Sequence, residues 1–272
     1  MNVALQSMPW LLPADWHLPA FTTAVFAPKR TRYCVVIPVI NEGARFLRQL
    51  AGMSAANLGI DIIVADGGSS DGSTDHDRLR QLNVRALLTK TGPGKLSAQL
   101  RMGFAYALDE GYAGIVTIDG NGKDGFTAIP AFVTALEQGF DFVQGSRYVE
   151  GGSAANTPVD RELGVRYLHA PLLSFAAGFR YTDTTNGFRA FSARFLRDPR
   201  VRPFRAVFDT YNLHYYLAVR APRLGHRVKE LPVRRDYPAK GPTPSKIGGL
   251  GGKLHILKQL LLTVVGAYNP RF

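Results

Sequence analysis

The chain contains one cysteine, Cys34, among its 272 residues, so no disulfide can form within it. Cys34 lies inside an apolar run, where a thiol is most often a packing residue. No stretch approaches the ~20 apolar residues that a membrane-spanning helix needs. The N-terminal residues do not follow a secretory signal pattern, because prolines interrupt their apolar part and Lys29 and Arg30 come after it. These features predict a chain that is soluble or lies on a membrane.

Acidic residues are scarce in the second half of the chain. The sequence has 33 Lys and Arg against 21 Asp and Glu, which gives a net charge of +12. Residues 1–150 hold 13 basic and 14 acidic residues, whereas residues 151–272 hold 20 basic and 7 acidic residues. The basic half predicts an anionic partner, which can be nucleic acid, an anionic membrane surface or a phosphorylated substrate. Composition alone does not choose among these three.

Short apolar runs alternate with helical patterns from residue 33 onward. Strands are expected at residues 33–38, 61–65, 84–88, 114–118 and 141–144, and helices at residues 42–56, 74–82, 95–110 and 127–138. Strict alternation of strand and helix predicts βαβ units with right-handed crossovers. The expected fold class is therefore α/β, with a mostly parallel central sheet and helices on both of its faces.

The pattern changes after residue 152, where the second wall of a crevice is expected. Its expected elements are helices at residues 160–177 and 208–220, a loop at 182–187, and short strands at 188–192 and 227–232. Residues 253–268 read as an amphipathic helix with basic flanks. No strongly polar linker divides the chain, so we expect one large domain. The expected parts are an N-terminal arm at 1–32, the domain at 33–250, with halves 33–150 and 151–250, and a C-terminal helix at 251–272.

Three of the expected strands end in acidic residues. Glu42 follows the first strand, Asp66 the second and Asp119 the fourth. Ligands of open α/β sheets collect at the carboxyl ends of the strands, so these acids are expected to face one crevice. Carboxylates in such a crevice accept hydrogen bonds from a base or ribose, and hold a divalent ion against a diphosphate. This arrangement points to nucleotide-sugar chemistry.

The two glycine-rich acidic turns each have an ordinary alternative. Residues 66–73 (DGGSSDGS) are typical of a surface turn, but their place after a buried strand favours a contact of Asp66 with the nucleotide, with Glu42 as a second contact. Asp119 and Asn121 can bind Mg²⁺ or Mn²⁺ through oxygen, and such an ion stabilises the charge on a leaving nucleoside diphosphate. Asp-Gly and Asn-Gly also favour tight turns. For residues 119–121 the two interpretations are evenly matched.

Basic residues in the second half suggest a phosphate site. Arg147 follows the fifth strand and Arg161 lies in the next helix, and two arginines aimed into a crevice recognise phosphate by bidentate hydrogen bonds. Residues 183–189 (DTTNGFR) form a loop with an acid and an arginine, for which a capped turn is the alternative. Lys246 lies in a segment rich in Pro and Gly that suits a lid closing on phosphate, although most such loops serve only as connections.

Taken together, these motifs resemble a known family. Residues 38–42 (PVINE) resemble the P-x-Y-N-E opening of family 2 glycosyltransferases, residues 65–73 resemble its D-D-G-S-x-D-G-T turn, and residues 119–121 lie where its D-x-D lies. Three later motifs resemble the G-S-R-Y, D-x-x-x-G-F-R and S-K elements of the dolichyl- and polyprenyl-phosphate sugar synthases, at residues 145–148, 183–189 and 245–246. The resemblance covers roughly residues 33–250. It implies a GT-A fold, a nucleotide-sugar donor, a divalent metal and inverting transfer.

The resemblance also implies roles for individual residues. Arg147 and Arg161 match the arginines that bind the acceptor phosphate in that branch, and Asp119, Asp183 and Arg189 are the catalytic candidates. The residues expected at the donor nucleotide are Pro38, Asn41, Glu42, Asp66, Gly68, Ser69, Lys95, Asp119, Gly120, Asn121 and Lys246.

Two positions depart from the family's metal motif. The second Asp of D-x-D is Asn121, a neutral and weaker ligand, and Lys123 stands where the branch has a glutamine ligand. A charged lysine cannot coordinate a metal. Either Asp119 and Asp124 hold Mg²⁺ or Mn²⁺ together with Asn121, or Lys123 partly replaces the ion as a counter-charge to the diphosphate.

The leading hypothesis is an inverting glycosyltransferase that moves a sugar from a UDP- or GDP-sugar to a membrane-associated acceptor, with polyprenyl phosphate as the first choice. We expect it to lie peripherally on the cytoplasmic face of the membrane, in contact through residues 253–268. A hydroxyl acceptor in polysaccharide or glycolipid synthesis is the alternative; it requires a general base, for which Asp183 is the candidate.

Two other classes of protein fit less well. A nucleic-acid-binding module is disfavoured, because the basic residues are dispersed among apolar helices and the acidic clusters would repel a phosphate backbone. A nucleotidyltransferase would show a basic, Gly-rich phosphate loop near the first strand, where this sequence has Asn41, Glu42 and Gly43.

Overall fold

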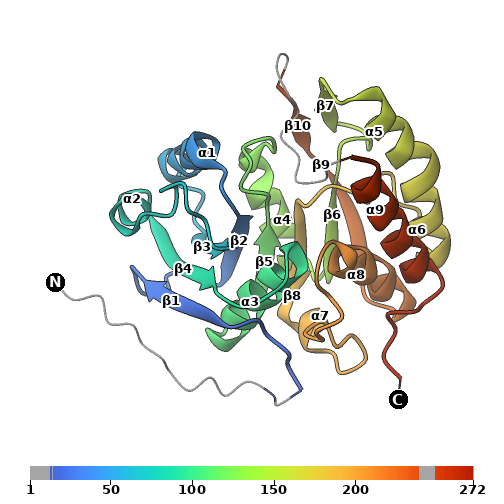
Figure 1. Ribbon diagram of the computed structural model, residues 1–272, viewed down its shortest axis with the longest axis horizontal. Helices are drawn as coiled ribbons and strands as arrows, with labels where there is room; N and C mark the ends of the chain where they lie inside the picture. Colours follow the sequence, from blue (N-terminus) through green and yellow to red (C-terminus); the bar gives the residue numbers. More distant parts are fainter. Residues whose placement is uncertain (1–12, 14, 239–248, 272) are drawn as a thin grey trace.

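An eight-stranded mixed sheet forms the centre of the molecule. The computed structural model describes residue 13, residues 15–238 and residues 249–271, so Lys246 and its loop lie outside the described residues. The strand order is β1-β4-β3-β2-β5-β8-β6-β9 (Figure 1). The strands are β1 (Phe21–Val25), β2 (Tyr33–Val39), β3 (Asp61–Asp66), β4 (Val84–Lys90), β5 (Gly114–Thr117), β6 (Phe142–Ser146), β8 (Arg189–Ser192) and β9 (Val228–Pro232).

The strands that carry the expected motifs run in parallel. β3 and β5 flank β2 on its two sides, both parallel to it, and β4 extends the sheet in parallel beyond β3. β8 lies antiparallel between β5 and β6, and β9 is parallel to β6. The ends of β2, β3 and β5 therefore meet at one edge of the sheet, as the sequence predicted.

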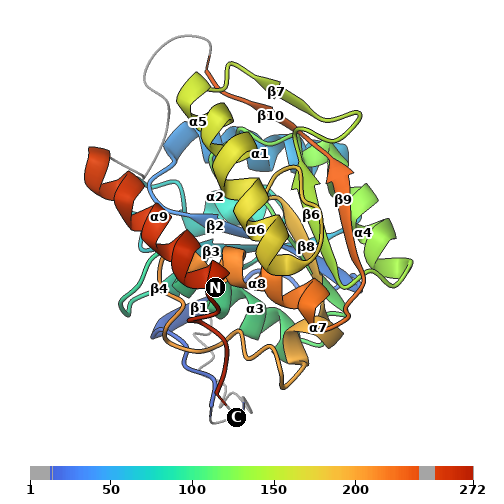
Figure 2. The same cartoon turned by 90° about the vertical axis from the view of Figure 1, so that its right-hand side faces the viewer.

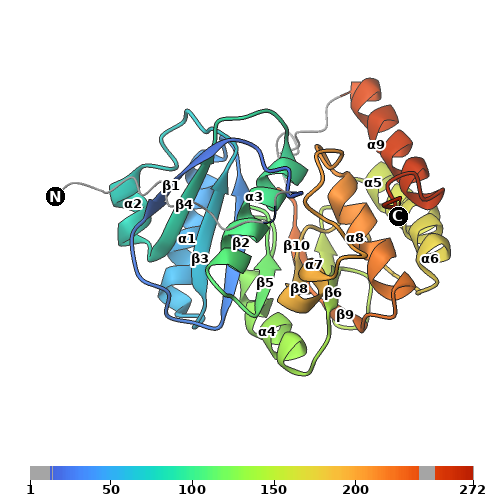
Figure 3. The same ribbon diagram turned by 90° about the horizontal axis from the view of Figure 1, so that it is seen from below.

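Helices cover both faces of the sheet. α1 (Gly43–Ala56), α2 (His76–Gln81) and α4 (Ile129–Glu137) contribute to one core, and α3 (Leu96–Asp109), α7 (Ala193–Arg197) and α8 (Asn212–Arg223) contribute to the other. Figure 3 looks onto α3, which crosses in front of the strands. In β2, Cys34 and Val36 pack into one core while Val35 and Ile37 pack into the other. Burial on both faces explains the unbroken apolar run, because successive side chains of a strand point to opposite faces.

Part of the expected N-terminal arm is a strand of the central sheet. β1 lies within residues 1–32 and pairs antiparallel with β4, with Phe21 opposite Lys90 and Val25 opposite Ala86. It is an edge strand of the sheet, and only Ala24 of its five residues is buried. Before β1 in the same segment, the ring of Trp16 stacks on Phe204 at 3.7 Å between centroids. A mostly exposed strand lacks the apolar run that marks the buried strands, so the sequence pattern missed it.

The second half adds a helical layer and a small sheet. α5 (Val159–Gly164), a π-helical turn η2 (Val165–His169) and α6 (Ala170–Ala177) follow one another directly, in place of the single helix expected at 160–177. α9 (Gly249–Val264) packs against α6 and α8, and Figure 2 shows α5, α6 and α9 on one side of the molecule. β7 (Ser153–Ala155) and β10 (Arg234–Asp236) pair in parallel. Within the described ranges, no helix combines the length and apolar character needed to cross a bilayer.

Candidate active site

The loops after β2 and β3 are tied together by reciprocal hydrogen bonds. The backbone N–H of Asn41 donates to Ser69 Oγ at 3.0 Å, and the N–H of Ser70 donates to Asn41 Oδ1 at 2.8 Å. Asn41 adopts a left-handed conformation with φ of 48°, which Asn tolerates better than most residues. Three of the expected donor-site residues, Asn41, Ser69 and the neighbouring Gly68, therefore lie together at one edge of the sheet.

Asp66 shapes the loop that follows it. Its carboxylate accepts hydrogen bonds from the backbone N–H of Ser69 at 2.9 Å and from Ser69 Oγ at 2.6 Å. Gly68 has φ of 94°, a conformation that side chains with a Cβ rarely adopt. Asp66 is 1 % exposed. A buried carboxylate that caps its own loop has a structural role even when a ligand is absent, so Asp66 both forms the turn and lines the strand edge.

Asp119 follows β5 and lies between two other loops. Gly120 donates its N–H to the carbonyl of Pro38 at 3.2 Å, which joins this turn to the end of β2. A Cβ at Gly187 would lie 2.5 Å from Asp119 Oδ1, so the loop at 182–187 can approach the carboxylate only because position 187 is glycine. The structure thus brings Asp119, Gly120 and Pro38 together with the second half of the chain.

A guanidinium lies between the two carboxylates that were expected to bind a metal. Arg235 Nη1 is 2.5 Å from Asp124 Oδ2, and Arg235 Nη2 is 3.1 Å from Asp119 Oδ2. Burial tends to raise the pKa of Asp119, but the positive charges of Arg235 and Lys123 outweigh it and hold that pKa below its ordinary value. Arg235 was not among the residues singled out from the sequence.

The donor set around Asp119 does not fit a divalent ion. The side chain of Asp124 is 0 % exposed and one of its oxygens is bound to Arg235, so this carboxylate is closed off from the crevice. Asn121 Nδ2 donates to Asp119 Oδ2, and Asn121 Oδ1 accepts the backbone N–H of Lys123. No group of three or more His, Cys, Asp or Glu side chains in the described part of the chain could hold a metal ion. The metal role expected for Asp124 is at odds with this geometry.

Lys123 is part of the same cluster. It is 8 % exposed, and its Nζ lies 5.0 Å from the centre of the Tyr237 ring. Burial and the charge of Arg235 lower the pKa of Lys123, while Asp119 raises it by a smaller amount. The face of Tyr237 is shared with Arg235, whose guanidinium carbon is 5.8 Å from the ring centre. The site at residue 119 is therefore already occupied by cationic side chains.

Arg147 is engaged by a buried carboxylate. Its Nε lies 2.6 Å and its Nη2 3.1 Å from the two oxygens of Asp183, and Nη2 also donates to Thr185 at 2.8 Å. The side chains of Arg147 and Asp183 are 3 % and 0 % exposed. Burial tends to raise the pKa of Asp183, but the guanidinium outweighs it and the pKa is lowered. A carboxylate in this state is a poor general base, and an arginine in this state is not open to an acceptor phosphate.

Arg189 is also a buried structural residue in this conformation. Its guanidinium donates to the backbone carbonyls of Asn186, His214 and Thr184 at 2.9, 2.5 and 2.7 Å, and the residue is 0 % exposed. Burial lowers its pKa to about 10. Arg189 holds the loop at 182–187 in place through its hydrogen bonds to the carbonyls of Thr184 and Asn186. The catalytic role expected from its motif is at odds with this burial.

The remaining expected residues lie nearer to solvent. Glu42 precedes α1 and pairs with Arg45 at 2.9 Å. Lys95 precedes α3 and is exposed. Arg161 lies in α5 and is partly exposed, with its guanidinium carbon 5.8 Å from the centre of the Tyr237 ring. Of the two arginines expected at an acceptor phosphate, Arg161 is the one that is open to a ligand.

The sequence offered a weak signal for Arg235 and Tyr237. They belong to the run RRDYP, which begins two positions after the end of the expected strand at 227–232. Strand ends were the rule used to find the acidic residues, but β9 lies at the far edge of the sheet order. Only the pairing of β10 with β7, and the bridge between Arg235 and Asp124, bring this segment back to the site.

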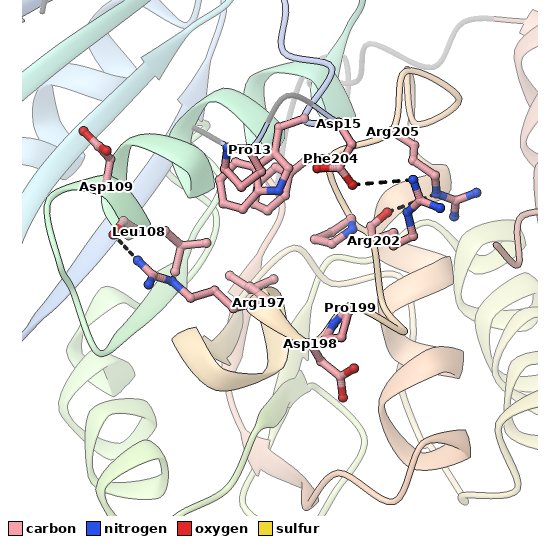
Figure 4. Close-up of a pocket in the computed structure, with 13 residues that line it drawn as sticks. Pro13, Asp15, Leu108, Asp109, Arg197, Asp198, Pro199, Arg202, Phe204 and Arg205 are labelled. Atoms are coloured by element: carbon pink, nitrogen blue, oxygen red, sulfur yellow. Dashed lines mark hydrogen bonds and ion pairs between the residues drawn. The ribbon is translucent and has the colours of Figure 1, made fainter. Parts of the chain in front are cut away.

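A cavity of about 650 Å³, whose lining residues are drawn in Figure 4, is lined by none of the candidate site residues. Its lining includes Leu108 and Asp109 at the end of α3, and Arg197 at the end of α7. Arg197 donates to the carbonyl of Leu108, and Arg202 pairs with Asp15 across the opening at 3.5 Å. α3 returns antiparallel to the strands of its βαβ unit, so its end lies at the opposite edge of the sheet from the candidate site. We assign no ligand to this cavity.

Comparison with known proteins agrees with this arrangement. The model of glycosyl transferase family 2 matches residues 34–200. The undecaprenyl-phosphate mannosyltransferase of Micrococcus luteus is 28 % identical over 204 residues, covering 74 % of this chain and 82 % of that protein. The polyprenol monophosphomannose synthase of Mycolicibacterium smegmatis is 28 % identical over 205 residues, covering 74 % and 76 %.

A solved structure with a similar fold is glucosyl-3-phosphoglycerate synthase from Mycobacterium tuberculosis, in complex with Mn²⁺, UDP and glucosyl-3-phosphoglycerate. It superposes with a TM-score of 0.58 at 18 % identity, covering 90 % of this chain and 87 % of that chain. At this identity the likeness concerns the fold alone. The GT-A fold expected from the sequence is confirmed.

Proposed function

The chain belongs to glycosyl transferase family 2, and from this membership we propose that it transfers a sugar from a UDP- or GDP-sugar to a polyprenyl phosphate, with inversion at the sugar carbon. Glycosyltransferase activity follows from the family, and the two relatives at 28 % identity are named for polyprenyl-phosphate acceptors. The donor, the acceptor and the residues that bind them are the parts that we propose.

We choose between the two acceptor classes from the burial and ion pairing of Asp183. A hydroxyl acceptor must lose a proton to a base, whereas an acceptor phosphate is already a nucleophile. Asp183 was the candidate base, but it is enclosed and paired with Arg147. This supports a phosphate acceptor over the hydroxyl alternative. We assign the acceptor phosphate to the side of the crevice where Arg161 is partly exposed next to Tyr237.

The donor is assigned to the edge where β2, β3 and β5 end. The loops there expose backbone groups and short polar side chains, which suit recognition of a base, a ribose and a diphosphate. The residues that we propose at the donor are Pro38, Asn41, Glu42, Asp66, Gly68, Ser69, Lys95, Asp119, Gly120 and Asn121. Lys246, which lies outside the described residues, remains a prediction from its motif.

A membrane contact is supported by where the large apolar side chains are exposed. Two helical segments, residues 159–177 and α9 with Val265 behind it, carry eight of the eleven large apolar residues exposed in the described part of the chain. α6 and α9 pack side by side. The exposed residues of this apolar face are Val159, Leu163, Tyr167, Leu168, Phe175, Leu254, Leu261 and Val265.

Exposed cations lie on the same two helical segments. Arg166, Lys253 and Lys258 are all exposed there. Apolar burial and attraction to anionic lipid act together in such surfaces, and the cytoplasmic leaflet is the anionic one. We therefore propose that the chain lies peripherally on the cytoplasmic face, with the apolar face against the lipid that carries the acceptor.

The function is tested by transfer from radiolabelled UDP- and GDP-sugars to a purified polyprenyl phosphate, with the corresponding polyprenol as the matched acceptor that lacks the phosphate. We expect a labelled lipid product with the phosphate and none with the alcohol. Product from the alcohol alone would favour the hydroxyl alternative. Asp119→Asn serves as the inactive control, because losing one preorganised polar contact at a transferase centre costs about 10² or more in rate.

A further inference from the structure

Arg235 is held at the carboxylates by its backbone as well as by its side chain. It lies in β10, opposite Ala154 of β7, and forms an isolated antiparallel bridge with Asp124 on its other side. The hydrogen bonds that flank this bridge run from the N–H of Asp236 to the carbonyl of Lys123 and from the N–H of Gly125 to the carbonyl of Arg234, both at 2.9 Å. The backbone that carries the guanidinium is therefore fixed on both sides by strand pairing.

The cluster is balanced in charge without an ion. Two carboxylates, Asp119 and Asp124, are matched by two cationic side chains, Arg235 and Lys123, and both cations lie against the ring of Tyr237. An ion that took the place of Arg235 would leave a buried guanidinium without partners, which is strongly unfavourable. An ion that left Arg235 in place would meet Asp124 Oδ1, which is buried beside the guanidinium without a hydrogen-bond partner, while the amide of Asn121 is already bonded.

We propose that Arg235 takes the place of a divalent metal ion at Asp119, so that the chain binds its nucleotide donor without Mg²⁺ or Mn²⁺. The claim about the nucleotide donor rests on the proposed function, whereas the claim that Arg235 takes the place of the ion does not. Asn121 and Lys123, which depart from the acidic metal motif of the family, then have a common explanation: no oxygen-rich ligand set is needed beside a guanidinium.

The deciding experiment is a titration of the whole chain with Mn²⁺, followed by the EPR signal of the free aqueous ion, with and without UDP or GDP. We expect no stoichiometric uptake up to about 1 mM free Mn²⁺, and nucleotide dissociation constants that differ by less than about threefold between EDTA and Mn²⁺. Uptake of one equivalent by the wild type, or a tenfold or greater tightening of nucleotide binding by Mn²⁺, would overturn the proposal.

Variants separate Arg235 from its neighbours. Arg235→Gln removes the cation, so Mn²⁺ should bind this variant at least tenfold more tightly than the wild type, while Arg234→Gln, the exposed neighbour on the same strand, should behave as wild type. If Arg235→Gln does not fold, Lys123→Gln provides the second variant. It keeps Arg235, so Mn²⁺ uptake should stay absent; uptake by this variant would assign the exclusion of the ion to Lys123 and reject our assignment.

The outcome for the ion is independent of the outcome for the nucleotide. A chain that binds neither UDP nor GDP under any condition contradicts the proposed function, whereas Mn²⁺ uptake in the absence of nucleotide still decides whether Arg235 holds the place of the metal.

Discussion

Arg147 and Asp183 form a bidentate ion pair inside the protein, with Nε 2.6 Å from one carboxylate oxygen and Nη2 3.1 Å from the other. Both residues were selected from the sequence for roles at the reacting groups. Their burial instead makes them the support of the loop at 182–187, whose glycine approaches Asp119. The pair acts on the site through the position of that loop.

Removing one partner of this pair should destabilise the fold. Asp183→Asn leaves the buried guanidinium without its counter-charge, and breaking a buried pair in this way costs about 3–5 kcal/mol in free energy of unfolding. Urea denaturation measures the change. Asp77→Asn, which breaks the exposed pair with Arg80, is the matched control and should cost about 1 kcal/mol or less. A loss below about 1 kcal/mol for Asp183→Asn would show that the pair is not a buried support.

Stability should fall between neutral pH and pH 4, in part because of His169. Burial lowers the pKa of His169 from 6.5 to about 4. The unfolded chain takes up this proton below pH 6.5 and the folded chain only below about pH 4, so the stabilising contribution is complete above 6.5 and is lost as the pH falls toward 4. The loss amounts to about 3 kcal/mol, at up to about 1.4 kcal/mol per pH unit.

The contribution of His169 is measured by urea unfolding at several pH values between 7 and 4. His169→Gln should reduce the slope of stability against pH, and His76→Gln, an exposed position, should leave it unchanged. Burial also lowers the pKa of His214, so part of the slope will remain in the His169 variant. An identical slope in the wild type and His169→Gln would contradict the prediction. The lowered pKa values of Asp119 and Asp183 reduce stability below about pH 5, so they add to the slope only at the acid end of this window.

Arg161 should act on the acceptor and not on the donor. It is the partly exposed member of the two expected phosphate-binding arginines, and a hydrogen bond to a charged group is worth about 1.5–3 kcal/mol. Arg161→Gln should therefore raise KM for polyprenyl phosphate about tenfold or more, with an unchanged dissociation constant for UDP or GDP. Arg147→Gln should instead lower stability. Loss of nucleotide affinity in Arg161→Gln would place this arginine at the donor.

The order of the elements could be predicted because buried strands such as β2 are apolar on both faces, whereas the helices show a helical periodicity of apolar residues. The strand-end rule selected Glu42, Asp66 and Asp119, which follow or end three parallel neighbouring strands of the sheet. It could not report which polar side chains are already paired. From the sequence, Arg147 is expected to bind the acceptor phosphate and Arg189 to be catalytic; only the three-dimensional structure shows that Arg147 contacts Asp183 and that Arg189 contacts three carbonyls.

Arg235 illustrates the other limit. Its approach to Asp124 spans 111 residues of sequence and depends on the pairing of two three-residue strands. Strands of that length carry too little periodicity to be recognised from sequence. The sequence indicated that this site is unusual, because Asn121 and Lys123 depart from the metal motif. The cation that explains this departure, Arg235, comes from the far end of the domain.

The apolar face predicts a salt-sensitive membrane contact. Tyr167 and Phe175 are 75 % and 80 % exposed, so replacing both by serine removes apolar area from the surface without affecting the core. Full burial of a large apolar side chain contributes about 1.5–3 kcal/mol. The double variant should therefore bind vesicles containing anionic lipid at least about tenfold more weakly than the wild type, as measured by cosedimentation.

Point variants are preferable to deletion of α9, because Leu260 of that helix is 1 % exposed and its removal would open the interior. Val25→Ser, on the edge strand β1, is the control with an exposed apolar side chain outside the apolar face and should bind as wild type. Lys258 adds an electrostatic part of about 1 kcal/mol, and Arg166 and Lys253 add less because they pair with Glu162 and Asp160, so binding should weaken in high salt and be poor on neutral vesicles. Equal binding to neutral and anionic vesicles would show that the basic residues do not contribute to the contact. Equal binding by the wild type and the double variant would show that the apolar face does not.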